Sequence, residues 1–183
     1  MGLLRPIGLA IAAATLALAT AGAPAAFAQD AKLADFAGAY QGGGVAEGRD
    51  NVYFTVTARD LDVAIRTRDG GFDLTWTTIS HRNQREGRTT RKTETISFVG
   101  TERPNVFRAA EPVEPLDGEA YYWARIAGRT LTVYAMTIAG NGAYELTSWA
   151  RTLTASGMEL TFSRLSDGDA VRTVRGKLVR VGP

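Results

Sequence analysis

Hydrophobic and polar residues alternate along most of the chain, which is the pattern of strands that are buried on one side. Only residues 31–36 could form a helical turn, and no later segment keeps the i, i+3, i+4 spacing of a longer helix. The alternation predicts strands over residues 39–47, 52–57, 61–68, 72–82, 92–99, 106–110, 121–126, 130–138, 144–154, 158–165 and 171–181.

Short turn signals separate the predicted strands. Glycine follows a small or polar residue at Asp69-Gly70, Ala127-Gly128, Asn141-Gly142, Ser156-Gly157 and Asp167-Gly168. A meander of many short strands hides its edges most completely by closing on itself. The sequence therefore predicts an all-β fold, an antiparallel up-and-down meander that forms a closed or nearly closed β-barrel of about 8–10 strands behind a short N-terminal helical turn.

The register of a hairpin can be predicted from its turn, because a two-residue turn fixes which residues face each other. Around Asp69-Gly70, one face of the hairpin is mostly apolar and pairs Thr67 with Phe72, Ile65 with Leu74 and Val63 with Trp76. The other face is mostly polar and pairs Arg66 with Asp73, Ala64 with Thr75 and Asp62 with Thr77. This hairpin is therefore expected to bury one side only.

The turns of the C-terminal hairpins likewise predict which side chains share a face. With Ala127-Gly128 and Asn141-Gly142 as two-residue turns, one face receives Tyr121, Trp123, Arg125, Thr132, Tyr134, Trp149 and Arg151. The opposite face receives Tyr122, Ala124, Ile126, Leu131, Val133, Ala135 and Ala150. If the next loop has an even length, Met158, Leu160 and Phe162 join the aromatic face, and we therefore place that face inside the barrel.

The predicted interior contains more than packing requires, since two arginines lie among aromatic rings. A buried guanidinium needs an acid, water or an anionic ligand, and Glu145 is the nearest carboxylate on the same face. We expect the lumen to bind a small hydrophobic or anionic amphipathic ligand, with its head group on arginine and its apolar part on the rings. The candidate ligand-binding residues are Trp76, Tyr121, Trp123, Arg125, Tyr134, Trp149, Arg151 and Phe162. Alternatively, the arginines emerge at the barrel rims and the rings only fill a core.

The first 28 residues have the features of a secretory signal peptide. Arg5 provides a basic start, residues 7–22 are uncharged and rich in Ala, Leu and Ile, and Ala26-Phe27-Ala28 is a small-x-small cleavage site. Cleavage near Ala28/Gln29 leaves a single barrel domain over residues 29–183, which we expect to be periplasmic or secreted without a transmembrane anchor. The alternative is a retained membrane-spanning segment.

Charge offers little for nucleic-acid binding. The formal net charge is +2 and falls to +1 when Arg5 is removed. One basic cluster stands out, formed by Arg82, Arg85, Arg88, Arg91 and Lys92. The alternative function is therefore a protein-interaction module, such as an inhibitor or an envelope-assembly factor, that acts through its loops and segment 82–92.

The sequence predicts no catalytic residue, metal site or cofactor. With no Cys and one His, the chain cannot form a disulfide framework, a thiolate nucleophile or a multi-histidine metal site. His81 and Ser80 are neighbours on one predicted strand and point to opposite faces. The carboxylate pairs Glu111/Glu114 and Asp167/Asp169 lie in loops rich in turn residues. We therefore expect a non-enzymatic protein.

The segment Phe36-Ala-Gly38-Ala-Tyr40-Gln-Gly42 resembles the opening of calycin barrels, which include lipocalins, fatty-acid-binding proteins and bacterial relatives. There a short helical turn leads into a first strand of the G-x-W-x-G type, and Tyr40 stands where Trp is usual. The resemblance implies a ligand-binding barrel and, from the fatty-acid-binding relatives, an interior arginine that holds a carboxylate. Heme-binding relatives use a histidine near the end of the chain, whereas His81 lies in the middle, which argues against heme.

Overall fold

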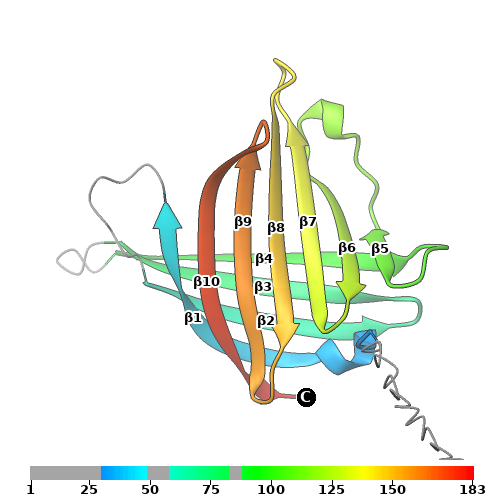
Figure 1. Cartoon of the computed structure of the whole chain (residues 1–183), viewed down its shortest axis with the longest axis vertical. Coiled ribbons are helices and arrows are strands. Elements are labelled where there is room, and N and C mark those ends of the chain that lie inside the picture. The colour runs from blue at the N-terminus through cyan, green and yellow to red at the C-terminus, as the bar shows by residue number, and fades with distance from the viewer. Residues whose placement is uncertain (1–29, 49–57, 83–87) are drawn as a thin grey trace, which may run out of the picture.

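The computed structural model describes residues 30–48, 58–82 and 88–183, with the backbone alone at residues 44–48, 58–60, 80–82 and 88–90. These residues form ten strands and two short 3-10 helices (Figure 1). The 3-10 helices are η1 (Leu33–Phe36) and η2 (Pro115–Asp117). The strands are β1 (Gly38–Gly48), β2 (Ala58–Arg68), β3 (Gly71–Arg82), β4 (Arg88–Gly100), β5 (Val106–Ala109), β6 (Tyr121–Ala127), β7 (Thr130–Ile138), β8 (Tyr144–Leu153), β9 (Gly157–Ser166) and β10 (Asp169–Gly182).

The ten strands form a closed antiparallel barrel in which each strand pairs with its neighbours in sequence. β1 pairs with β2 on one side and with β10 on the other, and this last pairing closes the sheet. In Figure 1, β2–β4 cross behind β6–β10 at a steep angle. The predicted all-β meander barrel is confirmed, and the short helical turn before β1 is η1. The predicted strand over residues 52–57 lies outside the described residues.

The β2–β3 hairpin has the predicted register. Val63 pairs with Trp76, and Ile65 pairs with Leu74. Ile65 and Leu74 are buried, whereas Arg66 on the alternate face is exposed. The apolar face of this hairpin therefore points into the barrel.

The β6–β7 turn differs from the prediction by two residues. Ala127 pairs with Thr130, so that the two central turn residues are Gly128 and Arg129, and Trp123 pairs with Tyr134. Gly128 adopts a positive φ of 57°. Glycine as the first central residue is typical of the type II′ hairpin turn, which explains why the turn begins there. A shift of two residues keeps the same side chains on the same face.

The register of the β7–β8 hairpin differs from the prediction by one residue, and this shift changes which side chains share a face. Ile138 pairs with Tyr144, which leaves residues 139–143 as a five-residue loop. The Asn141 side chain accepts a hydrogen bond from the backbone N of Ala143 at 3.0 Å, so Asn141 stabilises a longer loop instead of a two-residue turn. Trp149 therefore pairs with Val133, and the prediction that Tyr134 and Trp149 share a face is wrong.

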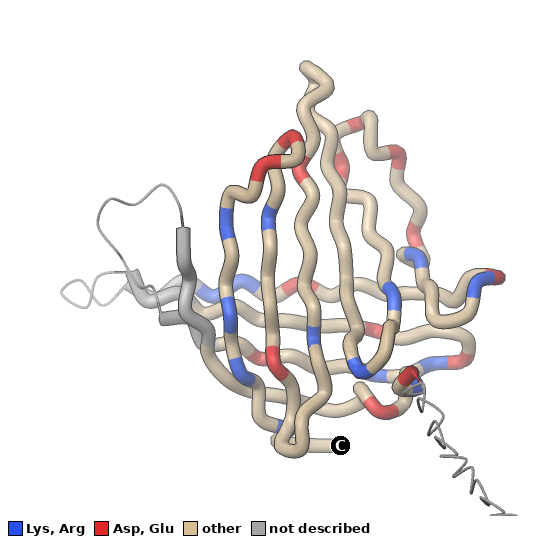
Figure 2. Tube along the Cα trace, in the orientation of Figure 1, with Lys and Arg blue, Asp and Glu red and all other residues tan. Residues whose placement is uncertain are grey.

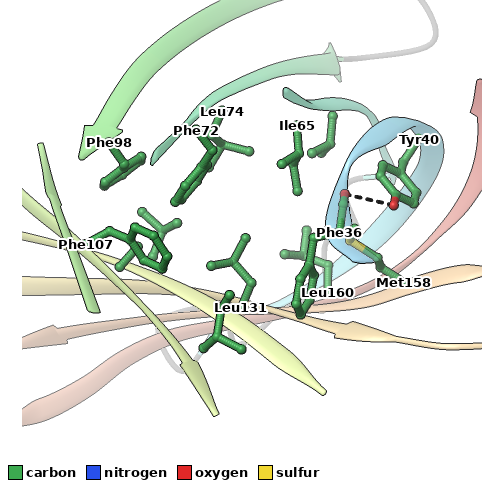
Figure 3. Packing of buried hydrophobic residues seen from close by; sticks show 14 of the residues in the cluster. Phe36, Tyr40, Ile65, Phe72, Leu74, Phe98, Phe107, Leu131, Met158 and Leu160 are labelled. Carbon is green, nitrogen blue, oxygen red and sulfur yellow. Dashed lines mark hydrogen bonds between the residues drawn. The ribbon is translucent and has the colours of Figure 1, made fainter. Parts of the chain in front are cut away.

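One part of the barrel is filled by a packed core. Phe72 stacks on Phe98 with ring centroids 4.8 Å apart, and its edge contacts Phe107 at 5.2 Å. Figure 3 shows these rings together with Leu74, and Leu131 across from them. All five side chains are buried in the same hydrophobic cluster. This packing leaves no room for a ligand in this part of the lumen.

The N-terminal turn packs against the core. The fully buried Phe36 comes from η1, and its backbone oxygen accepts a 2.9 Å hydrogen bond from the Tyr40 hydroxyl (Figure 3). Arg180 of β10 donates to the same hydroxyl at 2.7 Å and to the backbone carbonyl oxygen of Asp35 at 2.9 Å. Burial raises the pKa of Tyr40, and the charge of Arg180 opposes this effect. These bonds attach η1 to the two strands that close the barrel.

The first described residue, Asp30, forms hydrogen bonds with the β6–β7 turn and with Asn105. Its carboxylate accepts hydrogen bonds from the backbone N of Gly128 at 2.6 Å and from the Asn105 side chain at 3.1 Å. The next residue, Ala31, donates its backbone N–H to the Gly128 oxygen at 2.7 Å. The segment before β1 is therefore held at both of its ends.

Barrel closure requires glycine at residue 42. Gly42 of β1 pairs with Leu178 of β10 and with Leu61 of β2. A Cβ atom at this position would lie 1.8 Å from the Lys177 backbone oxygen, far inside van der Waals contact. The neighbouring backbone cannot yield without opening the β1–β10 pairing.

We predict that Gly42→Ala lowers the free energy of unfolding by about 2–3 kcal/mol, because the added methyl group separates the two closing strands. The matched control is Gly140→Ala in the β7–β8 loop, where a Cβ atom meets nothing within 4 Å. Urea denaturation of both variants measures the difference. Equal stability of G42A and the wild-type chain would contradict the account of closure.

Candidate ligand-binding site inside the barrel

The lumen beside the packed core contains a cavity of about 340 Å³. Its floor is formed by four buried side chains, Val63, Arg151, Leu160 and Val174, which come from four different strands. The volume lies near the lower end of the range for small-molecule pockets, roughly 300–1,000 Å³. The cavity is therefore large enough for one small ligand.

Aromatic rings form the wall above this floor. Trp76 of β3 and Trp149 of β8 face each other across the lumen with ring centroids 5.8 Å apart. Phe162 of β9 lies beside Trp149, with which it pairs across the strands, at a centroid distance of 5.6 Å. Neither contact is a parallel stack, since the interplanar angles are 41° and 60°. The wall presents ring surface to an apolar guest.

The mouth of the cavity is polar and is formed by Leu61, Thr78, Lys92 and Glu94. Lys92 and Glu94 are two residues apart on β4 and form an ion pair. Their side chains are 76% and 29% exposed, whereas Arg151 is 2% exposed. This gradient shows that the cavity opens to solvent beside β4 and ends at Arg151.

Arg151 is a buried cation without a carboxylate partner among the described residues. Its Nη1 donates only a long, 3.4 Å hydrogen bond to the Trp149 oxygen, and its Nε has no partner. Burial lowers the pKa of Arg151 to about 10, so the side chain remains charged at neutral pH. Burying an unpaired charge is expensive, and packing alone would be better served by Leu or Met.

The nearest interior carboxylate expected from the sequence is engaged elsewhere. Glu145 of β8 forms an ion pair with Arg164 of β9 at 3.0 Å. Both residues continue the inward-facing rows of Arg151 and Phe162, because side chains two residues apart share a face. The Arg164 Nε is also buried without a hydrogen-bond partner. Glu145 therefore compensates Arg164 and not Arg151.

The structure brings together half of the residues proposed for the site. Trp76, Trp149, Arg151 and Phe162 line the cavity. The other four, Tyr121, Trp123, Arg125 and Tyr134, were expected inside and lie on the outer face of the barrel. They alternate with Ala124, Ile126 and Val133, which are buried in the core cluster. The cause is the odd length of the β7–β8 loop, which places Trp149 and Tyr134 on opposite faces.

The four outward residues form a row of their own. Trp123 stacks on Tyr134 with centroids 4.9 Å apart and an interplanar angle of 10°. Tyr121 contacts Trp123 at 5.9 Å, and Arg125 is exposed. These rings are cross-strand pairs on the sheet surface. The alternative that the rings only fill a core is wrong for them, and Arg125 is no candidate for the lumen.

Lys92 and Glu94 were not assigned to the site from the sequence. The signal was present, since Lys92, Glu94, Ile96 and Phe98 alternate on one face of β4 and Phe98 is fully buried. A charged residue that shares a face with a buried phenylalanine at one strand end marks the point where the lumen opens.

The basic cluster of the alternative function falls largely outside the described part of the chain. The side chains of Arg82, Arg85 and Arg88 are not described. Arg91 is exposed, and its Nη2 lies 3.7 Å from a carboxylate oxygen of Asp62 on β2. Figure 2 shows Lys and Arg scattered over the strands with Asp and Glu among them. A protein-binding role of segment 82–92 stays a prediction.

The carboxylate pairs of the loops act in local turns. The Glu114 side chain accepts a hydrogen bond from the Leu116 backbone N at 3.2 Å and caps η2. Asp167 accepts a 2.9 Å bond from the Tyr144 backbone N. Among the described residues, no group of three or more His, Asp or Glu is placed to hold a metal ion. In the same part of the chain, no helix has the length and hydrophobicity needed to span a membrane.

Comparisons with known proteins show a likeness in structure and no match in sequence. No family model matches the chain, and no curated protein matches it. Among solved structures, the chain is similar to the S-type phycobiliprotein lyase CPES from Guillardia theta, at a TM-score of 0.38 and 6% sequence identity. The likeness covers 81% of this chain and 90% of that chain. No residue of the cavity is assigned from it.

We predict that Arg151→Met raises the free energy of unfolding of the ligand-free protein by about 2 kcal/mol, because it removes a buried, unpaired charge. The pKa of Arg151 is lowered on folding, so the penalty is present in full below about pH 10 and is relieved above it. The gain should therefore appear at neutral pH.

Arg125→Met on the outer face is the matched control, since an exposed arginine carries no such penalty. Its stability should stay within about 0.5 kcal/mol of the wild type. Thermal and urea denaturation measure both variants. A strongly destabilised R151M variant would show that Arg151 has a partner and would refute its description as an open site.

Proposed function

We propose that this chain is an exported, non-enzymatic barrel that binds a small amphiphile with one anionic head group. The observation that carries the proposal is the buried guanidinium of Arg151, whose Nε has no hydrogen-bond partner. A carboxylate can accept two parallel N–H bonds from a guanidinium and neutralise its charge. Such a ligand would compensate the one floor residue that the protein itself leaves uncompensated.

The wall supports an apolar body for this ligand. Trp76, Trp149 and Phe162 present ring faces and edges directly above the floor. Contact with such surface stabilises a bound apolar group by about 25 cal/mol per Å² removed from water. The combination of one deep cation and an aromatic wall favours an amphiphilic acid over a purely apolar or a purely polar guest.

The size of the cavity limits the ligand. A volume of about 340 Å³ suits a single short acyl chain or one small ring system, and it is too small for a two-chain lipid. The resemblance of the Phe36–Gly42 segment to calycin barrels agrees with this proposal, since fatty-acid-binding relatives hold a carboxylate on an interior arginine.

The proposal includes no chemical step. The cavity contains Arg, Lys, Glu and Thr side chains but no His or Cys, and the Lys92–Glu94 ion pair occupies both charged groups of its mouth. A nucleophile would need an adjacent base to activate it. The residues that line the cavity are therefore better suited to holding a ligand than to converting it.

We predict that the purified domain binds octanoate with one site per chain and that R151M weakens this binding at least tenfold. The variant loses a charge-assisted interaction with the head group, which contributes about 1.5–3 kcal/mol. Isothermal titration calorimetry measures the affinity. Fluorescence reports the approach of the ligand to Trp76 and Trp149.

Two comparisons sharpen this experiment. Arg125→Met should bind octanoate like the wild type, because Arg125 lies outside the barrel. Octanol and octylammonium should bind the wild type more weakly than octanoate, because neither neutralises Arg151. If R151M binds octanoate as tightly as the wild type does, or if octanol competes equally well, the lumen is no anion site.

Export is tested separately from binding. The features of residues 1–28 predict that the mature chain begins at Gln29, one residue before Asp30, whose carboxylate holds the β6–β7 turn. Intact-mass analysis of the native protein from envelope or culture fractions should give the mass of residues 29–183. A full-length chain that stays with the cytoplasmic fraction would refute export.

A further inference from the structure

The mouth of the cavity presents a hydrogen-bond donor and an acceptor close together. On the inner face of the β3–β4 hairpin, Trp76 pairs with Glu94, and Thr78 pairs with Lys92. Glu94 therefore lies at the level of the aromatic wall, and Lys92 lies one layer farther toward solvent. The ammonium donates, the carboxylate accepts and the Thr78 hydroxyl can do both.

An apolar layer separates this mouth from Arg151. Trp76 and Trp149 contact each other across the lumen, and Arg151 follows Trp149 by two residues on the same face of β8. A ligand whose carboxylate binds Arg151 must therefore extend its body along these rings, since rings in contact leave no space between them. Its far end then reaches the level of Glu94 and Lys92.

The charges at the mouth cancel, which distinguishes it from the floor. Lys92 and Glu94 form an ion pair, and Glu94 is the less exposed and deeper of the two. If the ligand carried a second carboxylate, Glu94 would repel it, because Glu94 lies deeper than Lys92. A neutral apolar end would form no hydrogen bond with either residue. A neutral hydroxyl or amide can both donate and accept there.

Tyr122 interacts electrostatically with both Glu94 and Lys92 from a position beside the cavity lining. This residue lies on the inner face of β6, opposite Ala135. Burial raises the pKa of Tyr122, the negative charge of Glu94 raises it further, and the charge of Lys92 opposes the increase. The phenol therefore stays protonated in the physiological range and keeps its hydrogen for donation.

From this arrangement we infer that the cavity selects monocarboxylic acids that carry a hydroxyl or amide group at the end opposite the carboxylate, and that Glu94 weakens the binding of dicarboxylic acids. The inference rests on the proposed function, because it assumes that an anionic head group binds Arg151. It specifies the chemical group at the far end of the ligand and assigns the selection of that group to Lys92 and Glu94 of β4.

The test compares three acids of equal chain length on the wild-type domain by calorimetry: octanoate, ω-hydroxyoctanoate and octanedioate. We expect ω-hydroxyoctanoate to bind about three- to tenfold more tightly than octanoate, as one additional hydrogen bond allows. Octanedioate should bind about fivefold more weakly than octanoate, because its second charge lies near Glu94.

The variant Glu94→Gln removes the negative charge at the mouth and keeps the size of the side chain. It leaves the ammonium of Lys92 unopposed at the mouth, so the affinity for octanedioate relative to that for octanoate should rise about five- to tenfold over the wild-type ratio. The matched control is Glu159→Gln on the outer face of β9, where the carboxylate is exposed and pairs across the strands with Lys177. This control should leave all three affinities unchanged.

The outcomes distinguish the two claims. If octanoate fails to bind the wild type, or binds without need of Arg151, the proposed function itself is refuted. If octanoate binds through Arg151 but the three acids bind equally, or if E94Q does not change the affinity for octanedioate relative to that for octanoate, the proposed function stands and the selectivity of the mouth is refuted. Circular dichroism of each variant confirms that the barrel is intact.

Discussion

Closure of the sheet between β1 and β10 is the contact on which the rest of this structure depends. The two strands approach so closely at Gly42 that no side chain fits between them, and Tyr40, Arg180 and Phe36 fasten the N-terminal turn beside the same seam. Once the seam is closed, every strand has one inner and one outer face, and the lumen must be either filled or left open. Here the phenylalanine core, with Phe98 near the end of β4, fills one part of it, and the cavity occupies the part beside Lys92 and Glu94, nearer the start of β4.

Closure also explains why the burial of Arg151 points to a functional site. On an open sheet, a long arginine side chain could reach water along the edge, but inside the barrel it stays 2% exposed and its Nε has no partner. The protein retains this charge although Leu or Met would pack at lower cost. A destabilising side chain in a well-formed core is typical of a functional site. The mouth shows the opposite arrangement, since Lys92 and Glu94 compensate each other. The two ends of the cavity therefore differ in what they can accept from a ligand.

The sequence was sufficient for the fold and for part of the site. Period-two alternation and glycine turns predicted the meander, and the Asp69-Gly70 turn predicted the β2–β3 register because its loop has only two residues. The β7–β8 loop could not be predicted in the same way. Asn-Gly is compatible both with a two-residue turn and with the longer loop that the Asn141 side chain stabilises. The two options shift the pairing of β7 with β8 by one residue. That single residue moved Tyr121, Trp123, Arg125 and Tyr134 to the outside, whereas Trp149 and Arg151 stayed inside because the following loop has an even length.

The most direct measurement of the central claim is the nitrogen–proton NMR correlation of the Arg151 Nε–Hε group, recorded with and without saturating octanoate. An unpaired Nε–Hε group that receives a carboxylate forms a short, charge-assisted hydrogen bond. We expect a large downfield shift of this proton and slower exchange with water, while the Nε–Hε signal of Arg125 stays in place. An Arg151 signal that does not move while octanoate is bound would contradict this expectation, because the head group would then lie elsewhere and the buried charge would have another purpose.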